Sequence, residues 1–355
     1  MAFDVSDALN SVDCIDELMP GTALLNDQYR VTRFLASGGF GITYVAKDAL
    51  DRDIALKECF VEAFCKRSQA RVVTRSEHHR ALLQRALGDF RQEARVLARM
   101  SHPNIVRIRQ YFEENDTAYM ALDFVHGHDL FEIIDEKRMF LTMGQVVDMA
   151  RKLLSAVATV HANGYVHCDI SPDNISVTRM GEPVLLDFGS ARPLVDGMAP
   201  RHSEFTCVKD GYSPHELYET AGACGAYSDI YALAATLYYV ITGRVPVDSS
   251  TRLRTILNDK PDPLKPLAGS VAGYPRAFLA SIDRALSVEP SARFQSVEAW
   301  MQAMDGVEAG EAGVPQPTHP ATPLRCLANR DRGAADRTVV LMRRATPQAA
   351  SRQAI

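Results

Sequence analysis

The sequence predicts an α+β fold in which a small strand-rich part precedes a larger, mainly helical part. Three observations support this. Short β-prone segments lie between residues 29 and 124. Beyond Gly127 the apolar residues recur at helical spacing, and residues 229–242 are apolar on nearly all sides. The length of 355 residues suits two domains, or one domain built of two lobes.

Composition and charge argue against several classes of protein. The chain is 46% hydrophobic and 23% charged, as is usual for a globular protein, and its net charge of −5 gives no general attraction to nucleic acid or anionic membranes. Residues Met1–Pro20 lack a basic region before an apolar one, so we expect no signal peptide. The longest strongly apolar run, Ile230–Ile241, is too short to cross a bilayer. We therefore expect a soluble protein with no nucleic-acid or membrane partner.

The cysteines indicate a reducing compartment. There are seven, an odd number, and no two have CxxC spacing. Free thiols in the cytoplasm explain this pattern better than disulfides or zinc ligands do.

Five strands are expected in the first part, after an acidic lead-in at residues 1–27 that has helical potential and no clear core. A Gly-rich turn joins the first two strands into a hairpin. The expected strands are Tyr29–Leu35, Ile42–Ala46, Ile54–Glu58, Ile105–Phe112 and Thr117–Phe124.

One helix is expected among these strands, at Phe90–Met100, because Phe90, Ala94 and Leu97 share a face. Before it, residues 60–89 are polar and locally basic. This charge run predicts a solvated surface insertion, with a docking site as the alternative.

The second part contains several expected helices. A long amphipathic helix runs through Val146–Val160 and ends at Asn163–Gly164. A buried helix spans Asp229–Thr242 and ends at Gly243, and two more are expected at Phe278–Leu286 and Ser296–Met304. Residues 306–355 lack sustained periodicity, which predicts a disordered tail. Within it, Thr338–Met342 has strand potential.

A short stretch between the helical segments carries chemistry. Asp169 precedes the carboxamide of Asn174 by five residues, and Asp187 follows an apolar run further on. An Asp that accepts a proton, followed by Asn and Asp at these spacings, can orient a hydroxyl and hold magnesium beside a triphosphate.

Taken together, these segments resemble the eukaryotic-like (Hanks-type) serine/threonine protein kinases of bacteria, over about residues 28–304. The resemblance implies a bilobal protein-kinase fold. Its small β-rich N-lobe, residues 28–124, has one regulatory helix, and its larger, mainly helical C-lobe is residues 125–304; residues 305–355 form the tail. It also implies ATP-dependent phosphorylation of serine and threonine on proteins, autophosphorylation included, with ATP and Mg²⁺ or Mn²⁺.

The Gly-rich turn would bind the triphosphate, because glycine lacks the Cβ that would block the approach of phosphate oxygens to the backbone. Gly38 and Gly41 match the second and third glycines of the kinase loop, and Ala36 stands at the first. The resemblance assigns nucleotide binding to these residues: Leu35, Ala36, Ser37, Gly38, Gly39, Phe40, Gly41, Ile42, Thr43, Ala55, Lys57, Asp123, Val125 and Asp129.

Within that set, the segment from Asp123 to Val125 resembles the hinge, with Leu122 as gatekeeper. Backbone groups of Asp123 and Val125 would bond adenine. Asp129 would meet the ribose hydroxyls, with a helix N-cap as the alternative role.

Five residues match the catalytic positions of the family. Lys57 would contact the α- and β-phosphates, and a lysine at that depth needs a partner, which Glu93 would provide. Asp169 would orient the substrate hydroxyl and accept its proton, while Asn174 and Asp187 would ligate the metal.

Three later matches favour a protein kinase over other phosphotransferases, in structural roles. Residues 212–216 resemble the end of the activation loop, and Asp229 resembles the residue that braces the catalytic loop. Arg293 is placed to pair with Glu216.

Two positions depart from the commonest family pattern. Cys168 replaces the usual Arg before the catalytic Asp, so we expect activity without phosphorylation of Ser203 or Thr206. Ser171 replaces a Lys that would neutralise the transferring phosphate, which predicts a lower rate. For Cys168 a small packed residue is the expected role, with a redox sensor as the alternative.

Other functions stay open on the sequence. A pseudokinase would bind ATP as a signalling scaffold without turnover, and a small-molecule kinase would share the Asp and Asn spacing. In the tail, a phosphorylated Thr338 or Thr346 is a candidate docking site for a phosphothreonine-reading domain, such as a forkhead-associated domain. The alternative is an unstructured tail with no partner.

Overall fold

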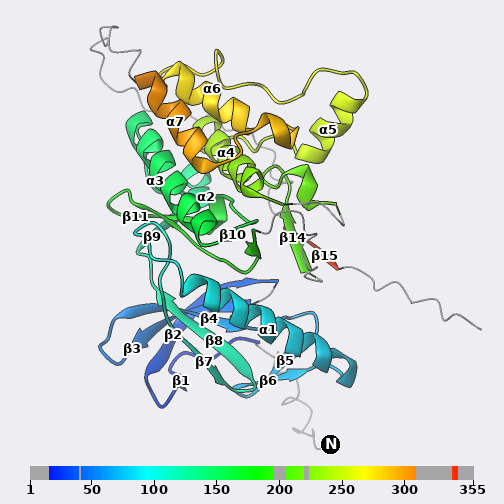
Figure 1. Cartoon of the computed structure of the whole chain (residues 1–355). Coiled ribbons are helices and arrows are strands. Elements are labelled where there is room, and N and C mark those ends of the chain that lie inside the picture. The colour runs from blue at the N-terminus through cyan, green and yellow to red at the C-terminus, as the bar shows by residue number, and fades with distance from the viewer. Residues whose placement is uncertain (1–15, 40, 195–204, 220–223, 309–337, 343–355) are drawn as a thin grey trace, which may run out of the picture. The chain divides into compact units, whose positions relative to one another are not determined.

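A computed structural model describes residues 16–39, 41–194, 205–219, 224–308 and 338–342 of the chain (Figure 1). The chain divides into two compact units. The first is Met1–Ile133 with Asp173–Ala191, and the second is Ile134–Pro172 with Arg192–Ile355. Strands dominate the first unit and helices the second, which confirms the predicted α+β fold.

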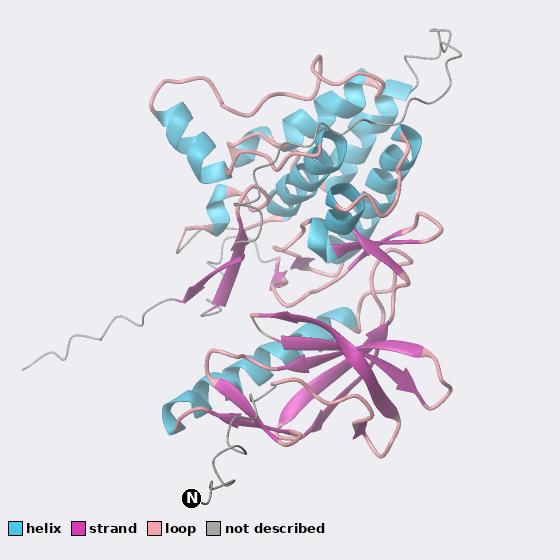
Figure 2. Ribbon diagram, turned by 180° about the vertical axis from the view of Figure 1, so that it is seen from behind, coloured by secondary structure: helices cyan, strands magenta, loops and turns pink. Residues whose placement is uncertain are grey.

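The first unit is built on a six-stranded antiparallel sheet (Figure 2). All five expected strands are present, and β1 is an addition. In sheet order the strands are β1 (Ala23–Leu24), β2 (Tyr29–Gly38), β3 (Gly41–Asp48), β4 (Asp53–Cys59), β8 (Thr117–Asp123) and β7 (Ile108–Glu114).

Helix α1 (Arg80–Leu97) packs against β4, β7 and β8. The predicted start at Phe90 was wrong. Leu83 and Ala86 are buried like Phe90, so the apolar face of the helix begins before Phe90. The short helix η2 (Glu77–His79) precedes α1.

Residues 60–89 are not the solvated insertion that the charge run predicted. They contain the hairpin of β5 (Cys65–Ser68) and β6 (Arg71–Thr74). Phe60, Phe64 and Val72 are buried, and so is the guanidinium of Arg67. Most of the other basic side chains are exposed, which is why the pattern resembled a solvated segment.

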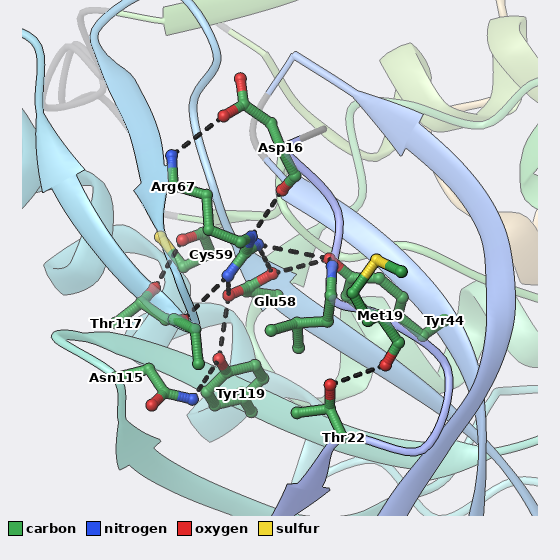
Figure 3. A network of polar contacts seen from close by, with 12 residues as sticks. Asp16, Met19, Thr22, Tyr44, Glu58, Cys59, Arg67, Asn115, Thr117 and Tyr119 are labelled. Carbon is green, nitrogen blue, oxygen red and sulfur yellow. Dashed lines mark hydrogen bonds and ion pairs between the residues drawn. The ribbon is translucent and has the colours of Figure 1, made fainter. Parts of the chain in front are cut away.

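The lead-in also has a core contact that the sequence did not reveal. Leu18 and Leu24 are buried, and Asp16 binds Arg67 through both its backbone carbonyl and its carboxylate (Figure 3). The segment from Asp16 onward is therefore part of the first unit.

A second, three-stranded sheet in the first unit has the order β12-β11-β9. It consists of β9 (Gly127–Asp129), β11 (Ile175–Thr178) and β12 (Pro183–Leu185), and α2 (Leu130–Asp135) follows β9. Gly127 permits the close pairing, because a Cβ there would lie 2.1 Å from the carbonyl oxygen of Val177.

The second unit is organised around α4 (Ala226–Thr242), whose residues Ser228–Ile241 are all buried, as predicted. Gly243 ends α4 with a φ of 65°. Around it lie α3 (Met143–Ala162), α6 (Arg276–Ala285) and α7 (Val297–Glu308), with α5 (Ser249–Leu257) after α4. The predicted helices are present, and α5 and α2 were missed because they are short.

Short elements complete the fold. They are β10 (Tyr165–Val166), η3 (Pro172–Asn174), β13 (Arg192–Pro193), β14 (Phe205–Lys209), η4 (His215–Leu217), η5 (Pro290–Ala292) and β15 (Thr338–Met342). The strand-prone island of the tail is β15, and it pairs antiparallel with β14. The rest of the predicted disordered tail lies outside the described residues. No helix in the described ranges has the length and apolar character that a bilayer span requires.

Candidate active site

The first unit brings together Lys57, Glu93 and Asp187. Lys57 lies on β4, Glu93 on α1 and Asp187 two residues beyond β12. The Lys57 Nζ lies 2.7 Å from Glu93 Oε1 and 2.8 Å from Asp187 Oδ1. One ammonium therefore bridges two carboxylates that are distant in the sequence, and Glu93 is the partner that the sequence predicted for Lys57.

The electrostatics of this triad follow from burial and charge. Burial by itself would lower the pKa of Lys57, but the Asp187 and Glu93 carboxylates outweigh it and hold that pKa above its ordinary value. Burial raises the pKa of Glu93 to about 7, with Lys57 opposing the rise and Asp187 adding to it. Lys57 is thus a firmly charged ammonium.

Asp187 is held in a constrained turn. Its φ is 47°, in the left-handed region, and Gly189 donates its backbone N–H to Asp187 Oδ1 at 3.0 Å. A Cβ on Gly189 would lie 3.2 Å from that oxygen and 3.3 Å from Glu93 Oε2. Glycine is therefore the residue that fits between the two carboxylates.

Asn174 lies beside Asp187 because β11 and β12 are antiparallel, with Ile175 opposite Leu185. The backbone N–H of Leu186 donates to the backbone carbonyl oxygen of Asn174 at 2.8 Å. Asn174, which has a carboxamide, and Asp187, which has a carboxylate, thus lie at the same end of one hairpin. Such oxygen donors suit Mg²⁺ or Mn²⁺. In the part of the chain that the structure describes, no group of three or more His, Cys, Asp or Glu is placed to hold a metal ion.

The Gly-rich turn connects β2 to β3, with Gly38 opposite Gly41. A Cβ on Gly41 would lie 2.6 Å from the carbonyl oxygen of Glu58, whereas one on Gly38 would meet nothing within 4 Å. Of the residues predicted to bind nucleotide, these strands carry Leu35, Ala36, Ser37, Gly38, Gly41, Ile42 and Thr43, with Gly39 in the turn and Ala55 on β4. Phe40 lies outside the described residues.

The predicted hinge begins at Asp123, the last residue of β8, and continues beyond the strand to Val125. The Asp123 N–H already donates to the carbonyl oxygen of Arg107 at 2.9 Å, and its carboxylate binds Arg109. Asp129 caps α2, since its Oδ1 accepts the Glu132 N–H at 2.7 Å. The N-cap alternative for Asp129 is therefore present, and its assignment to ribose stays a prediction.

In the second unit, Asp169 lies beside a lysine that the sequence did not single out. The Lys209 Nζ is 3.2 Å from Asp169 Oδ1 and donates to Ser171 Oγ at 2.8 Å. Lys209 is the last residue of β14 and lies 38 residues from Ser171. Its place, three residues before the segment 212–216, was the only signal available in the sequence.

Asp229 braces the catalytic loop as predicted. It is fully buried, its Oδ2 accepts the His167 N–H at 2.8 Å, and its Oδ1 accepts the Cys168 N–H at 2.9 Å. His161 Nε2 lies 2.8 Å from the same Oδ2. Burial opposes ionisation, yet the hydrogen bond and charge of His161, with help from His167, hold the pKa of Asp229 below its ordinary value.

The predicted pair of Glu216 and Arg293 is present. Arg293 Nη1 donates to Glu216 Oε1 at 2.7 Å, and Ser228 Oγ donates to the same oxygen at 2.9 Å. Both charged side chains are buried. This pair ties the segment 212–216 to the residues that follow α6.

Cys168 packs beneath the loop, in the role expected from the sequence. It forms a cluster with Val166, Val208 and Leu217, and Cys224 packs against it. The hydrogen bond between the two thiols and burial raise the pKa of Cys168. The same hydrogen bond, aided by Arg192, lowers the pKa of Cys224 to about 7 despite its partial burial. Cys168 itself is therefore a packed thiol and not a reactive thiolate.

Comparisons with known proteins agree with this arrangement. The family described as "Protein kinase domain" matches residues 29–303. Serine/threonine-protein kinase pkn2 of Myxococcus xanthus is 29% identical over 329 residues, which cover 86% of this chain and 37% of the relative. Serine/threonine-protein kinase PrkC of Bacillus subtilis is 30% identical over 234 residues, covering 66% and 33%. This chain thus spans well under half the length of these two relatives.

A solved structure, "PpkA-294 apo form", has a TM-score of 0.68 and 32% sequence identity, and the match covers 81% of this chain and 99% of that one. Its fold, together with the bacterial serine/threonine kinases above, confirms the resemblance that the sequence predicted. The chain belongs to the protein kinase domain family.

Proposed function

We propose that the protein transfers the γ-phosphate of ATP to serine and threonine hydroxyls of proteins, its own chain included. The contact that carries this proposal is the Lys57 ammonium between the carboxylates of Glu93 and Asp187. Such an ion pair holds a lysine charged and aimed at the phosphates of a nucleotide. The kinase domain is assigned to residues 28–304, with lobes at 28–124 and 125–304.

On the nucleotide side, Lys57 binds the α- and β-phosphates and the backbone of residues 35–43 covers the triphosphate. Adenine bonds the carbonyl of Asp123 and backbone groups of Val125. The N–H of Asp123 already donates to the backbone carbonyl of Arg107, so the carbonyl of Asp123 is the group assigned to adenine. Asp129, whose Oδ1 caps α2, is the residue assigned to the ribose hydroxyls.

Asn174 and Asp187 are the residues that would hold Mg²⁺ or Mn²⁺, since both lie at the same end of the β11–β12 hairpin and carry oxygen donors. A metal held there would supply positive charge to offset the negative charge that develops on the phosphate during transfer. The Lys57 ammonium also places a positive charge beside the Asp187 carboxylate.

Asp169 orients the acceptor hydroxyl and takes its proton. The hydroxyl oxygen forms the new bond to the γ-phosphorus, the bond to the β–γ bridging oxygen breaks, and ADP leaves. Asp229 supports this step by holding the backbone of His167 and Cys168 in place.

The test is transfer of label from γ-labelled ATP to the protein and to a generic basic protein. We expect label with wild type and almost none with Asp169→Asn or Lys57→Met, while the exposed-lysine control Lys260→Met behaves as wild type. Equal label in wild type and Asp169→Asn would refute the assignment. ATP binding with no transfer would instead favour the pseudokinase, and transfer confined to small molecules would favour a small-molecule kinase.

We also propose Thr338 as an autophosphorylation site whose phosphothreonine docks a reading domain of the forkhead-associated kind. The β14–β15 pairing supports this, since it sets Thr338 opposite Lys209, the residue whose ammonium contacts Asp169. Phosphopeptide mapping after autophosphorylation should find phosphate at Thr338 and none in Asp169→Asn. Absence of phosphate at Thr338 and Thr346 would refute the docking proposal.

The cytoplasm is the proposed location. Cys59, Cys65, Cys168 and Cys224 are free thiols, although Cys168 and Cys224 are in contact. Neighbouring thiols persist without a disulfide in a reducing compartment, which is the reason for this proposal. Fractionation of the producing cells, followed by thiol labelling under denaturing conditions, would test this.

A further inference from the structure

The catalytic loop lacks a cation where the family usually has one. Ser171 stands two residues after Asp169, where serine/threonine kinases carry a lysine that neutralises the transferring phosphate. Ser171 is fully buried, and its hydroxyl carries no charge. On the sequence alone, this change predicts a slower enzyme.

The structure brings a lysine to this position from another element. The Lys209 Nζ donates to Ser171 Oγ at 2.8 Å and lies 3.2 Å from Asp169 Oδ1. The side chains of Lys209 and Asp169 are each 13% exposed, so solvent screens this charge only weakly. The ammonium therefore lies beside the serine that replaces the usual lysine.

The backbone of Lys209 is fixed by a tight turn. Its N–H donates to Ser213 Oγ at 2.9 Å, and its carbonyl oxygen accepts the N–H groups of Tyr212 and Ser213 at 3.0 and 2.9 Å. Gly211 within the turn has a φ of 86°, and a Cβ there would lie 2.4 Å from Val245 Cγ1. The turn is thus held against the residues that follow α4, and it aims Lys209 at the catalytic loop.

We propose that Lys209 supplies, from β14, the positive charge that Ser171 no longer provides. This inference rests on the proposed kinase function. A hydroxyl held by Asp169 lies within about 3 Å of that carboxylate. The Lys209 ammonium, on the same carboxylate, is then on the order of 6 Å or less from the oxygen that attacks phosphorus. The cation that position 171 lacks is therefore present on Lys209, beside Ser171 and Asp169.

Lys209 acts partly through Asp169, so it is a positioning residue that also contributes charge. A merely structural role, such as holding β14 against the loop, would make the same two contacts. The two roles differ in what an exchange of side chains would do. A charge contribution can be restored from position 171, whereas a strand anchor cannot.

The experiment measures kcat and the KM for ATP in the phosphorylation of a generic basic protein. The thermal unfolding midpoint of each variant is measured alongside. The variants are Lys209→Met, Lys209→Arg, Ser171→Lys and the double variant Ser171→Lys with Lys209→Ser. Exposed Lys260→Met is the matched control and should behave as wild type.

We expect Lys209→Met to lower kcat about a hundredfold with little change in the KM for ATP, and Lys209→Arg to retain part of the rate. Ser171→Lys alone should also lower kcat, because it buries a second ammonium beside Lys209. The double variant should recover kcat to within about tenfold of wild type.

Two results would overturn the role of Lys209 while leaving the kinase function intact: a kcat for Lys209→Met close to wild type, or a higher kcat for Ser171→Lys alone. Absence of any Asp169-dependent transfer by wild type would overturn the kinase function and this role with it. If Lys209→Met does not fold, the double variant decides, since a folded double variant without recovered kcat also refutes the exchange.

Discussion

Arg67 and Glu58 form a buried two-point ion pair in the first unit. Arg67 Nη1 lies 3.0 Å from Glu58 Oε1, and Arg67 Nη2 lies 2.5 Å from Glu58 Oε2. Tyr44 and Tyr119 each donate a hydroxyl hydrogen bond to the same carboxylate at 2.9 Å (Figure 3). The hairpin β5–β6 is thereby tied to the strand that carries Lys57.

Removal of one partner should be strongly destabilising, because it leaves a buried charge unpaired. We expect Arg67→Ala to lower the free energy of unfolding by about 3–5 kcal/mol. The comparison is Arg71→Ala, which breaks the exposed pair with Asp116 and should cost at most about 1 kcal/mol. Chemical denaturation of both variants measures the difference. Equal losses of unfolding free energy would show that the buried ion pair stabilises the protein no more than the exposed one does.

This network also marks the limit of what the sequence could predict. The five main strands and α4 followed from local patterns, and the pairing of Glu216 with Arg293 followed from the resemblance to protein kinases. Arg67 cannot be told from its exposed neighbours by sequence, because the burial of its charge depends on tertiary contacts with Glu58. For the same reason, the place of Lys209 before the segment 212–216 did not by itself predict a contact with Ser171.

Asp229→Asn should loosen the catalytic loop. The variant loses the charge that attracts the N–H groups of His167 and Cys168, and each hydrogen bond to a charged group contributes about 1.5–3 kcal/mol. We expect a lower unfolding free energy and a lower kcat. Asp148→Asn, an exposed change on α3, is the control and should leave both unchanged.

The same residue should contribute to acid sensitivity. The folded-state pKa of Asp229 lies below its ordinary value of 3.8, so its stabilisation is complete above that pH and disappears as the pH falls through the lower folded value. The difference in unfolding free energy between wild type and Asp229→Asn should therefore shrink below about pH 4. A difference that stayed constant down to pH 2 would contradict this.

Activity should not depend on phosphorylation of the activation segment. Cys168 stands where related kinases have an arginine that binds the phosphorylated activation segment. It packs against Val208 and Leu217 and has no positive charge to offer a phosphate. We expect the double variant Ser203→Ala with Thr206→Ala to keep kcat within about twofold of wild type. Phosphatase-treated wild type serves as the second sample, and loss of activity in both, with folding intact, would refute the prediction.

The two glycines of the β2–β3 hairpin should respond differently to alanine. A Cβ at Gly41 would lie 2.6 Å from the Glu58 carbonyl oxygen, in a neighbouring backbone that cannot easily move, whereas a Cβ at Gly38 would meet nothing within 4 Å. Gly41→Ala should therefore lower the unfolding free energy by about 1–3 kcal/mol. Gly38→Ala should leave stability within about 0.5 kcal/mol of wild type and weaken only the binding of ATP.

Denaturation and ATP titration of the two variants separate these effects. Loss of ATP affinity in Gly38→Ala at unchanged stability would mean that this glycine serves the approach of phosphate to the backbone. Equal stability of the two variants would instead mean that β3 and β4 can separate enough to admit a methyl group at Gly41, and that the close contact with Glu58 is not what requires glycine there.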